Sequence, residues 1–295
     1  MTVTYRVTHR TTYRYEADVG PGYSQLHLQP RDLPSQRCLA TQITVEPAPS
    51  DYREWTDFFG NRVAYLAIEA PHRSLTLTAV STVEVDDRDA PTLFSGGSWE
   101  DARDDIRSHR DASARDAAAF VLDSPLVRAS VMFADYARPS FTPGRALLEA
   151  VADLASRIHR DFTFKPGATS VTTALEEAFE LRKGVCQDFA HVAIACIRSM
   201  GLAARYVSGY LETNPPPGAA KLQGSDVSHA WASVYAPGLG WFGIDPTNDR
   251  FVGGRYVTTA WGRDYSDVPP VSGVIFTNGG TASLDVEVDV IPFTP

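Results

Sequence analysis

The segment from residue 185 to residue 200 constrains the fold most strongly, because its apolar side chains recur at steps of three and four positions. That period places them on one face of an α-helix, and Gly201 directly after them is typical of a helix end. The sequence therefore predicts an amphipathic helix here. The apolar members of its stripe are Val185, Phe189, Val192, Ala193, Cys196, Ile197 and Met200.

The chain before this helix has a different pattern. Through about residue 95, apolar and polar residues alternate in short runs, separated by turn-type segments such as PAPSD and FFGN. This period of two predicts an N-terminal, sandwich-like all-β domain over residues 1–95. Acidic and basic residues are then interleaved, and Ser98 can cap a helix that begins at Trp99. We expect a charged, solvated helical connector over residues 96–130.

Strand-type runs follow the helix. The segments ARYVSGYL, SHAWASVY and GWFGIDPT are short, apolar and rich in β-forming residues, and LDVEVDV from Leu284 to Val290 alternates strictly. The fold class expected for the whole chain is therefore α+β. In residues 131–295 the helix that carries Cys186 should pack on an antiparallel sheet, and this unit should include the C-terminal strand.

Composition excludes several classes of protein. Of the 295 residues, 43% are apolar, so the chain can bury a core and is not disordered as a whole. The net charge is −9 without a basic tract, which argues against a nucleic-acid partner. No run approaches the ~18 apolar residues of a membrane span, so no membrane association is expected.

Cysteine usage bears on cofactors and compartment. Three cysteines, Cys38, Cys186 and Cys196, cannot form a disulfide framework, and no CxxC pair suggests zinc. No acidic loop has calcium-ligand spacing, so no metal or other cofactor is expected. The N-terminus lacks the apolar stretch of a secretory signal. We therefore expect a cytoplasmic protein in a reducing compartment. The sequence does not predict the oligomeric state.

Cys186 occupies the first turn of the predicted helix. Unpaired backbone N–H groups and the positive end of the helix dipole favour an anionic sulfur there, and the same N–H groups can stabilise an oxyanion. A lone cysteine is more often an inert packing residue, however. Cys196 is that inert case, because it lies on the apolar stripe about 15 Å along the helix axis.

His229 and Asp245 provide a second constraint. His229 begins one strand-type run and Asp245 ends the next, and each lies eight residues from Pro237 in the intervening turn. An antiparallel hairpin centred on Pro237 would place the two directly opposite each other, with Cβ atoms roughly 4.5–5.5 Å apart. A carboxylate can then hold one imidazole nitrogen while the other faces a nucleophile. A structural hydrogen bond is the alternative interpretation of this pair alone.

The blocks GVCQDFAHVAIACIRSMGLAARYVSGYL, SHAWASVY and GWFGIDPTN resemble, in order and spacing, the three motif blocks of transglutaminase-like thiol enzymes. HLQPRDLPSQR, DFFGN and GRDYSDVPPVSGV resemble the bacterial subgroup that has an extra N-terminal β domain. The resemblance implies a papain-like catalytic core over residues 131–295 with a Cys186–His229–Asp245 triad.

The implied chemistry is attack of Cys186 on an amide carbonyl, with a thioester intermediate. Water as acceptor gives a cysteine peptidase or amidase, which we favour, and an amine gives a protein-glutamine transglutaminase. Acyl transfer from a thioester such as acetyl-CoA and a non-catalytic scaffold on the same fold are the remaining alternatives. The expected partner is a peptide or protein amide substrate.

Other residues in these blocks have roles outside the triad. Asp188 is expected to cap the helix, and His191 to be a buried, hydrogen-bonded histidine. Trp231 and Trp241 are in phase with His229 and Asp245, so they could wall a substrate groove or belong to the core. Tyr210 in the ARYVSGYL block is a further candidate for substrate binding.

Overall fold

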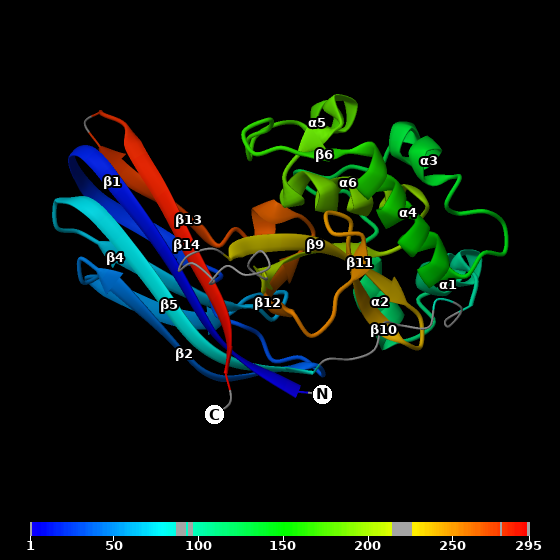
Figure 1. The fold of residues 1–295 in the computed structure, drawn as a ribbon, viewed down its shortest axis with the longest axis horizontal. Helices are drawn as coiled ribbons and strands as arrows, with labels where there is room; N and C mark the ends of the chain where they lie inside the picture. The colour runs from blue at the N-terminus through cyan, green and yellow to red at the C-terminus, as the bar shows by residue number, and fades with distance from the viewer. Residues whose placement is uncertain (1, 87–92, 94–96, 214–225, 278, 294–295) are drawn as a thin grey trace, which may run out of the picture.

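The computed structural model describes residues 2–86, 93, 97–213, 226–277 and 279–293. Two units lie side by side: a β domain, which includes the first and the last described strands, and an α+β domain that holds the predicted helix (Figure 1). This arrangement confirms the expected fold class.

Within the described ranges, seven strands form the β domain, and four of the others pair with the first of them. The first half of β1 pairs with β5 and β14, and its second half pairs with β4 and β13, with a register shift between Arg14 and Val19. Leu26 at the end of β1 and Leu66 of β4 pack in one cluster with Leu77 of β5, which makes the domain sandwich-like. The strands are β1 (Thr2–Leu26), β2 (Gln36–Glu46), β3 (Asp51–Thr56), β4 (Arg62–Ile68), β5 (His72–Asp86), β13 (Val271–Thr277) and β14 (Ala282–Phe293).

The C-terminal strand corrects the predicted domain division. We expected residues 131–295 to form one unit, but β13 and β14 both pair with β1. The last part of the chain therefore belongs to the N-terminal sheet. Strand alternation is local, whereas the choice of a partner strand depends on which edge the folded chain leaves open, so the sequence pattern predicted the strand and not its sheet.

The second unit has a five-stranded antiparallel sheet in the order β11-β10-β9-β8-β12. Its strands are β8 (Ala204–Leu211), β9 (Val227–Ala236), β10 (Gly240–Asp245), β11 (Arg250–Phe251) and β12 (Tyr256–Gly262). Its helices are α1 (Trp99–Arg107), α2 (Ala112–Ala118), α3 (Val131–Ala137), α4 (Leu147–Asp161), α5 (Leu175–Leu181), α6 (Cys186–Ser199) and the 3-10 turn η1 (Tyr265–Asp267). A short parallel pair, β6 (Thr163–Phe164) with β7 (Lys183–Gly184), precedes α6.

The helix α6 confirms that this segment is helical but not that it is amphipathic, because every residue from Asp188 to Arg198 is buried. It packs against β9 and sits in one large apolar core with α4 and the sheet. Gly201 follows it with φ of +80°, a left-handed conformation that ends the helix at little cost for glycine. The core members of α6 are Phe189, Ala190, Val192, Ala193, Ile194, Ala195, Cys196 and Ile197.

The predicted connector is helical, but part of it is buried in the core rather than solvated. The Ser98 side chain accepts a hydrogen bond from the backbone N–H of Asp101, so α1 begins at Trp99 as predicted. Trp99 and Ile106 are nevertheless buried in the same core as α6, and so is Phe120 beyond α2. Charged residues dominate the composition of this segment, yet its few apolar residues share a face, and that face decides where the helices dock.

The β domain closes the free edge of β12 with two amide side chains. Gln36 accepts from the Thr258 N–H and donates to the Thr258 carbonyl, both at 2.8 Å. Asn61 makes the same pair of bonds with Trp261, both at 2.9 Å. These side chains replace the missing neighbouring strand, so the two units are tied together along β12.

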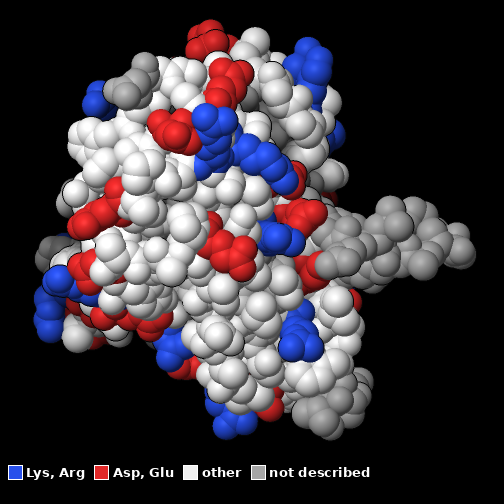
Figure 2. Space-filling model, turned by 90° about the vertical axis from the view of Figure 1, so that its left-hand side faces the viewer, with Lys and Arg blue, Asp and Glu red and all other residues white. Residues whose placement is uncertain are grey.

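The outer face of the β domain shows acidic and basic side chains interspersed (Figure 2). Among the described residues, no helix combines the length and apolarity required to cross a membrane.

Candidate active site

Cys186 is the first residue of α6 and is half-buried. The backbone N–H of Val185 donates to the Asp188 carboxylate at 2.7 Å, and Thr169 donates to the same oxygen at 2.7 Å. Gly184 permits this cap, since a Cβ there would lie 2.3 Å from the Asp188 carboxylate. Asp188 therefore fixes the turn that presents Cys186, in agreement with its expected role in capping.

His229 on β9 and Asp245 at the end of β10 are in direct contact. The Nε2 of His229 lies 2.7 Å from the Asp245 Oδ2, and both side chains are buried. This leaves the other ring nitrogen, Nδ1, for a different partner, and the side chain of Cys186 is close enough to interact with the ring. The structure thus brings the three predicted residues together.

The hairpin register that suggested this contact was wrong by two residues. Gly240 pairs with Ala236, so the hairpin is centred on Gly238 rather than Pro237. The observed turn uses residues 237–239, with Gly238 at φ of +74°. The shift preserves the faces of both strands, so His229 and Asp245 meet as diagonal neighbours instead of directly opposed ones.

Asp245 is held by groups that the sequence analysis did not identify. Its Oδ2 accepts from the Asn248 side chain at 2.7 Å and from the Tyr256 hydroxyl at 2.8 Å. Its Oδ1 accepts from the backbone N–H of Thr247 at 2.9 Å. Asn248 follows Asp245 in the block GWFGIDPTN, and its position three residues on could have suggested a turn contact. No local signal points to Tyr256, which lies on another strand.

The two partners shift each other's pKa. Burial would lower the pKa of His229, but interactions with the side chains of Asp245 and Cys186 more than offset it and raise that pKa to about 9. Burial would likewise raise the pKa of Asp245, but hydrogen bonds from His229, Asn248 and Tyr256 hold it below its usual value. The arrangement therefore favours an imidazolium beside a carboxylate.

Cys196 and His191 lie in the opposite kind of environment. Cys196 is fully buried in the apolar core, which raises the pKa of its thiol. The Nε2 of His191 accepts the backbone N–H of Tyr265 at 3.1 Å, and burial lowers the pKa of His191 to about 4. Both residues behave as expected, as packing and hydrogen-bonding groups.

Of the three candidate substrate-contacting residues, Trp231 and Trp241 line a cavity and Tyr210 does not. The Trp231 ring packs 6.1 Å from that of His229 and lies over Gly209 and Gly243, where any Cβ would collide with it or with its neighbours. Trp231 and Trp241 both line a cavity of about 220 Å³. Tyr210 instead packs against His9 where the two domains meet. In the described part of the chain, it lines none of the three cavities.

Among the residues that the structure places, no three His, Cys, Asp or Glu side chains are grouped as a metal site would require.

Two family profiles match this chain. Residues 5–84 match the bacterial transglutaminase-like N-terminal region, and residues 134–246 match the transglutaminase-like superfamily. The first covers most of the β domain before α1. The second contains Cys186, His229 and Asp245.

Full-length relatives occur in mycobacteria. An uncharacterised protein of Mycobacterium tuberculosis is 46% identical over 98% of this chain and 93% of its own length. One of Mycobacterium leprae is 31% identical over 97% of both chains. A crystal structure of a candidate cysteine protease from Cytophaga hutchinsonii superposes with a TM-score of 0.76 at 21% identity, over all of this chain and 93% of that one. That likeness extends to both domains and shows that they share this fold.

Proposed function

Because this chain belongs to the transglutaminase-like superfamily, we propose that it is a thiol-dependent enzyme that hydrolyses amide bonds in a peptide or protein through Cys186, His229 and Asp245. The observation that carries the proposal is the buried 2.7 Å contact of His229 with Asp245 beside Cys186 at the start of α6. A buried pair with no function would not need a cysteine at that position.

In the reactive form the proton of the Cys186 thiol is on His229. The Cys186 sulfur attacks the carbonyl carbon, and the backbone N–H of Cys186 at the helix start stabilises the resulting oxyanion. The carbon–nitrogen bond then breaks, and the proton from His229 leaves with the amine. A thioester to Cys186 remains.

Water resolves the thioester. His229 accepts a proton from the attacking water, the carbon–sulfur bond breaks, and the carboxylic acid leaves as the sulfur takes back the bonding electrons. Asp245 keeps Nε2 of the ring engaged throughout, so that Nδ1 stays directed to the reacting atoms. We further propose that the enzyme works in the reducing cytoplasm, where Cys186 remains a free thiol.

The test compares wild type with Cys186→Ala on a panel of peptide amides, with and without an added primary amine. Hydrolysis by wild type alone supports the proposal. Amide exchange that requires the amine would show a transglutaminase instead. No turnover of any peptide amide, together with a mass increase of the intact protein on incubation with acyl-CoA, would show acyl transfer from a thioester.

A thiol-directed alkylating probe separates an enzyme from a scaffold. We expect it to label Cys186 rapidly and Cys196 negligibly, with the labelling of Cys186 strongly slowed in His229→Ala. Cys196→Ala is the matched control and should label as wild type does. Equally slow labelling of Cys186 in wild type and in His229→Ala would contradict the catalytic role.

A further inference from the structure

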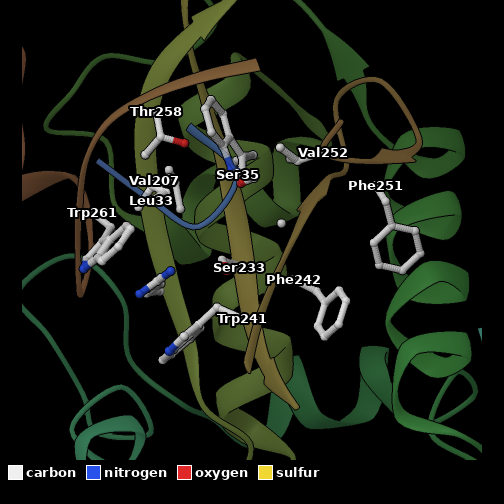
Figure 3. A pocket seen from close by; sticks show the side chains of 13 residues that line it. Leu33, Ser35, Val207, Ser233, Trp241, Phe242, Phe251, Val252, Thr258 and Trp261 are labelled. Carbon is white, nitrogen blue, oxygen red and sulfur yellow. The ribbon is translucent and has the colours of Figure 1, made fainter. Parts of the chain in front are cut away.

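A cavity of about 220 Å³ opens at the seam between the two domains. Leu33 and Ser35 of the β domain form one side, and strands β8 to β12 form the rest. Figure 3 shows Trp241 and Trp261 together at one side of the cavity and Ser233 near its centre. A second cavity, of about 960 Å³, shares Leu33, Ser35, Trp241 and Trp261 with it, so the site is accessible from the seam.

Arg205 lines both cavities and is held between two indole rings. Its guanidinium carbon lies 3.6 Å from the ring centroid of Trp261 and 4.1 Å from that of Trp241. Arg31 lies 3.4 Å from the Trp261 centroid, so the two guanidinium groups must occupy opposite faces of that ring. Stacking of this kind stabilises the positive charge of the guanidinium through its two flat faces. It leaves the N–H groups at the edge of the guanidinium free for hydrogen bonds.

Among the residues that the structure describes, that edge has no hydrogen-bond partner. Arg205 is 9% exposed, its buried Nε has no hydrogen-bond acceptor, and no carboxylate in the described part of the chain forms an ion pair with it. Burial and the charge of Arg31 lower the pKa of Arg205 well below its usual value, with no acidic group to oppose them. Arg31 also has a buried Nε without an acceptor, but its Nη1 donates to the carbonyl of Phe59 and to the Asn61 side chain.

A buried, unpaired cation is costly, and the cation–π contacts satisfy only the faces of the Arg205 guanidinium. A brace between strands would not need to line a cavity, as Arg205 does. Residues with hydroxyl groups also line the cavity: Ser233, which is the direct cross-strand neighbour of Arg205, and Ser35 and Thr258. These are donors suited to an anion.

We propose that this cavity binds a carboxylate group, with the guanidinium of Arg205 as its main ligand. A carboxylate is planar, matches the two N–H groups at the guanidinium edge, and needs one cation. A phosphate dianion would call for more positive charge, and Arg31 is already engaged. The carboxylate can belong to a free small acid or to an acidic residue of the substrate. Binding itself does not depend on the proposed chemistry of Cys186.

The binding test uses the full-length Cys186→Ala protein, so that no turnover interferes. N-acetyl-L-glutamate α-amide is titrated against the matched N-acetyl-L-glutamine α-amide, which differs only in its uncharged side-chain amide. Trp231, Trp241 and Trp261 line the cavity and provide an intrinsic fluorescence signal. We expect saturable binding of the acid with a Kd of about 1 mM or tighter, and at least roughly tenfold weaker binding of the amide.

Two variants make the result specific to this cavity. Arg205→Met should weaken binding of the acid by at least roughly tenfold, and Arg205→Lys by less, because the point charge remains. Ser233→Leu fills the cavity and should abolish binding with Arg205 in place, which covers the case that Arg205→Met does not fold. Equal binding of acid and amide, tighter binding of inorganic phosphate, unchanged binding in Ser233→Leu, or no saturable binding would overturn the proposal.

A second arm identifies the source of the carboxylate, and this arm rests on the proposed function. If the carboxylate belongs to the substrate, wild type should have a lower KM for acidic than for neutral peptide amides, and Arg205→Met should remove that difference. If it belongs to a free acid, Arg205→Met should leave the substrate preference unchanged while it still weakens binding in the titration.

Discussion

The two ends of α6 carry the same residue type in opposite surroundings. Cys186 is half-buried at the first turn, beside a histidine whose pKa is raised to about 9. Cys196 is fully buried among apolar side chains, and His191, on the same helix, has its pKa lowered to about 4. Both histidines are buried, so burial alone does not decide whether an imidazole carries its charge.

A partner decides it. The carboxylate of Asp245 lies 2.7 Å from Nε2 of His229 and stabilises the protonated ring, which offsets its loss of hydration. The Nε2 of His191 instead accepts a hydrogen bond from a backbone N–H, so this nitrogen must be unprotonated. The same rule separates His229 from Arg205, which is a buried cation without a carboxylate. Burying the charged side chains of His229 and Arg205 costs free energy, and we therefore expect a reactive or binding role at these two positions.

The largest contrast between the two ends should appear in turnover. Cys186→Ala removes the nucleophile and should reduce kcat/KM for a peptide amide roughly 10⁴-fold or more. Cys196→Ala should retain turnover close to wild type and lose about 1–2 kcal/mol of unfolding free energy, because it leaves a small cavity in the core. Steady-state kinetics and urea unfolding measure these effects. Comparable losses of turnover in both variants would break the comparison.

The pH dependence should separate the two histidines. The pKa of His229 is raised in the fold from its usual value near 6.5 to about 9, so protonation of His229 stabilises the folded state. That contribution is complete below pH about 6.5 and is lost as the pH rises through about 9. Because the proposed reaction needs the His229 imidazolium as proton donor, kcat/KM should also fall as the pH rises through about 9.

Thermal melts and kcat/KM profiles across this range test that dependence. His229→Gln should flatten the decline of Tm between pH about 6.5 and 9, since it removes the titrating group. His191→Gln should leave the decline in place, because the pKa of His191 is about 4 and its ring is already neutral there. A decline that survives in His229→Gln would assign it to another group.

The smallest effects are expected from the residues that hold Asp245. Tyr256→Phe and Asn248→Ala each remove one hydrogen bond to its carboxylate, which corresponds to a loss of roughly tenfold in kcat/KM. Because both donors share the Asp245 Oδ2 with His229, each variant should leave that oxygen more basic and raise the upper pKa of the activity profile, and their effects should not add. A loss of turnover with an unmoved profile would indicate a structural role only.

The candidate site was largely predictable because its signals are local. A helix period, a glycine stop and a cysteine at the first turn identify Cys186, and two strand-type runs across one turn identify His229 and Asp245 as neighbours. The register was wrong, yet the contact formed, since a shift by two residues keeps both side chains on the same face. A shift by one residue would have separated them.

The sequence by itself determined where the main helix and the strand-type runs form, because these depend on periods of two and 3.6 residues along the chain. The three candidate reactive residues followed from the helix start, the hairpin and the resemblance of the motif blocks to transglutaminase-like enzymes. The tertiary structure alone decided that β14 joins the N-terminal sheet, that Trp99 and Ile106 are buried, and that Tyr256 reaches Asp245. It also placed Arg205 between two indoles from different strands. Contacts of this kind join residues far apart in sequence, and they are set by the packing of whole faces rather than by neighbours in the chain.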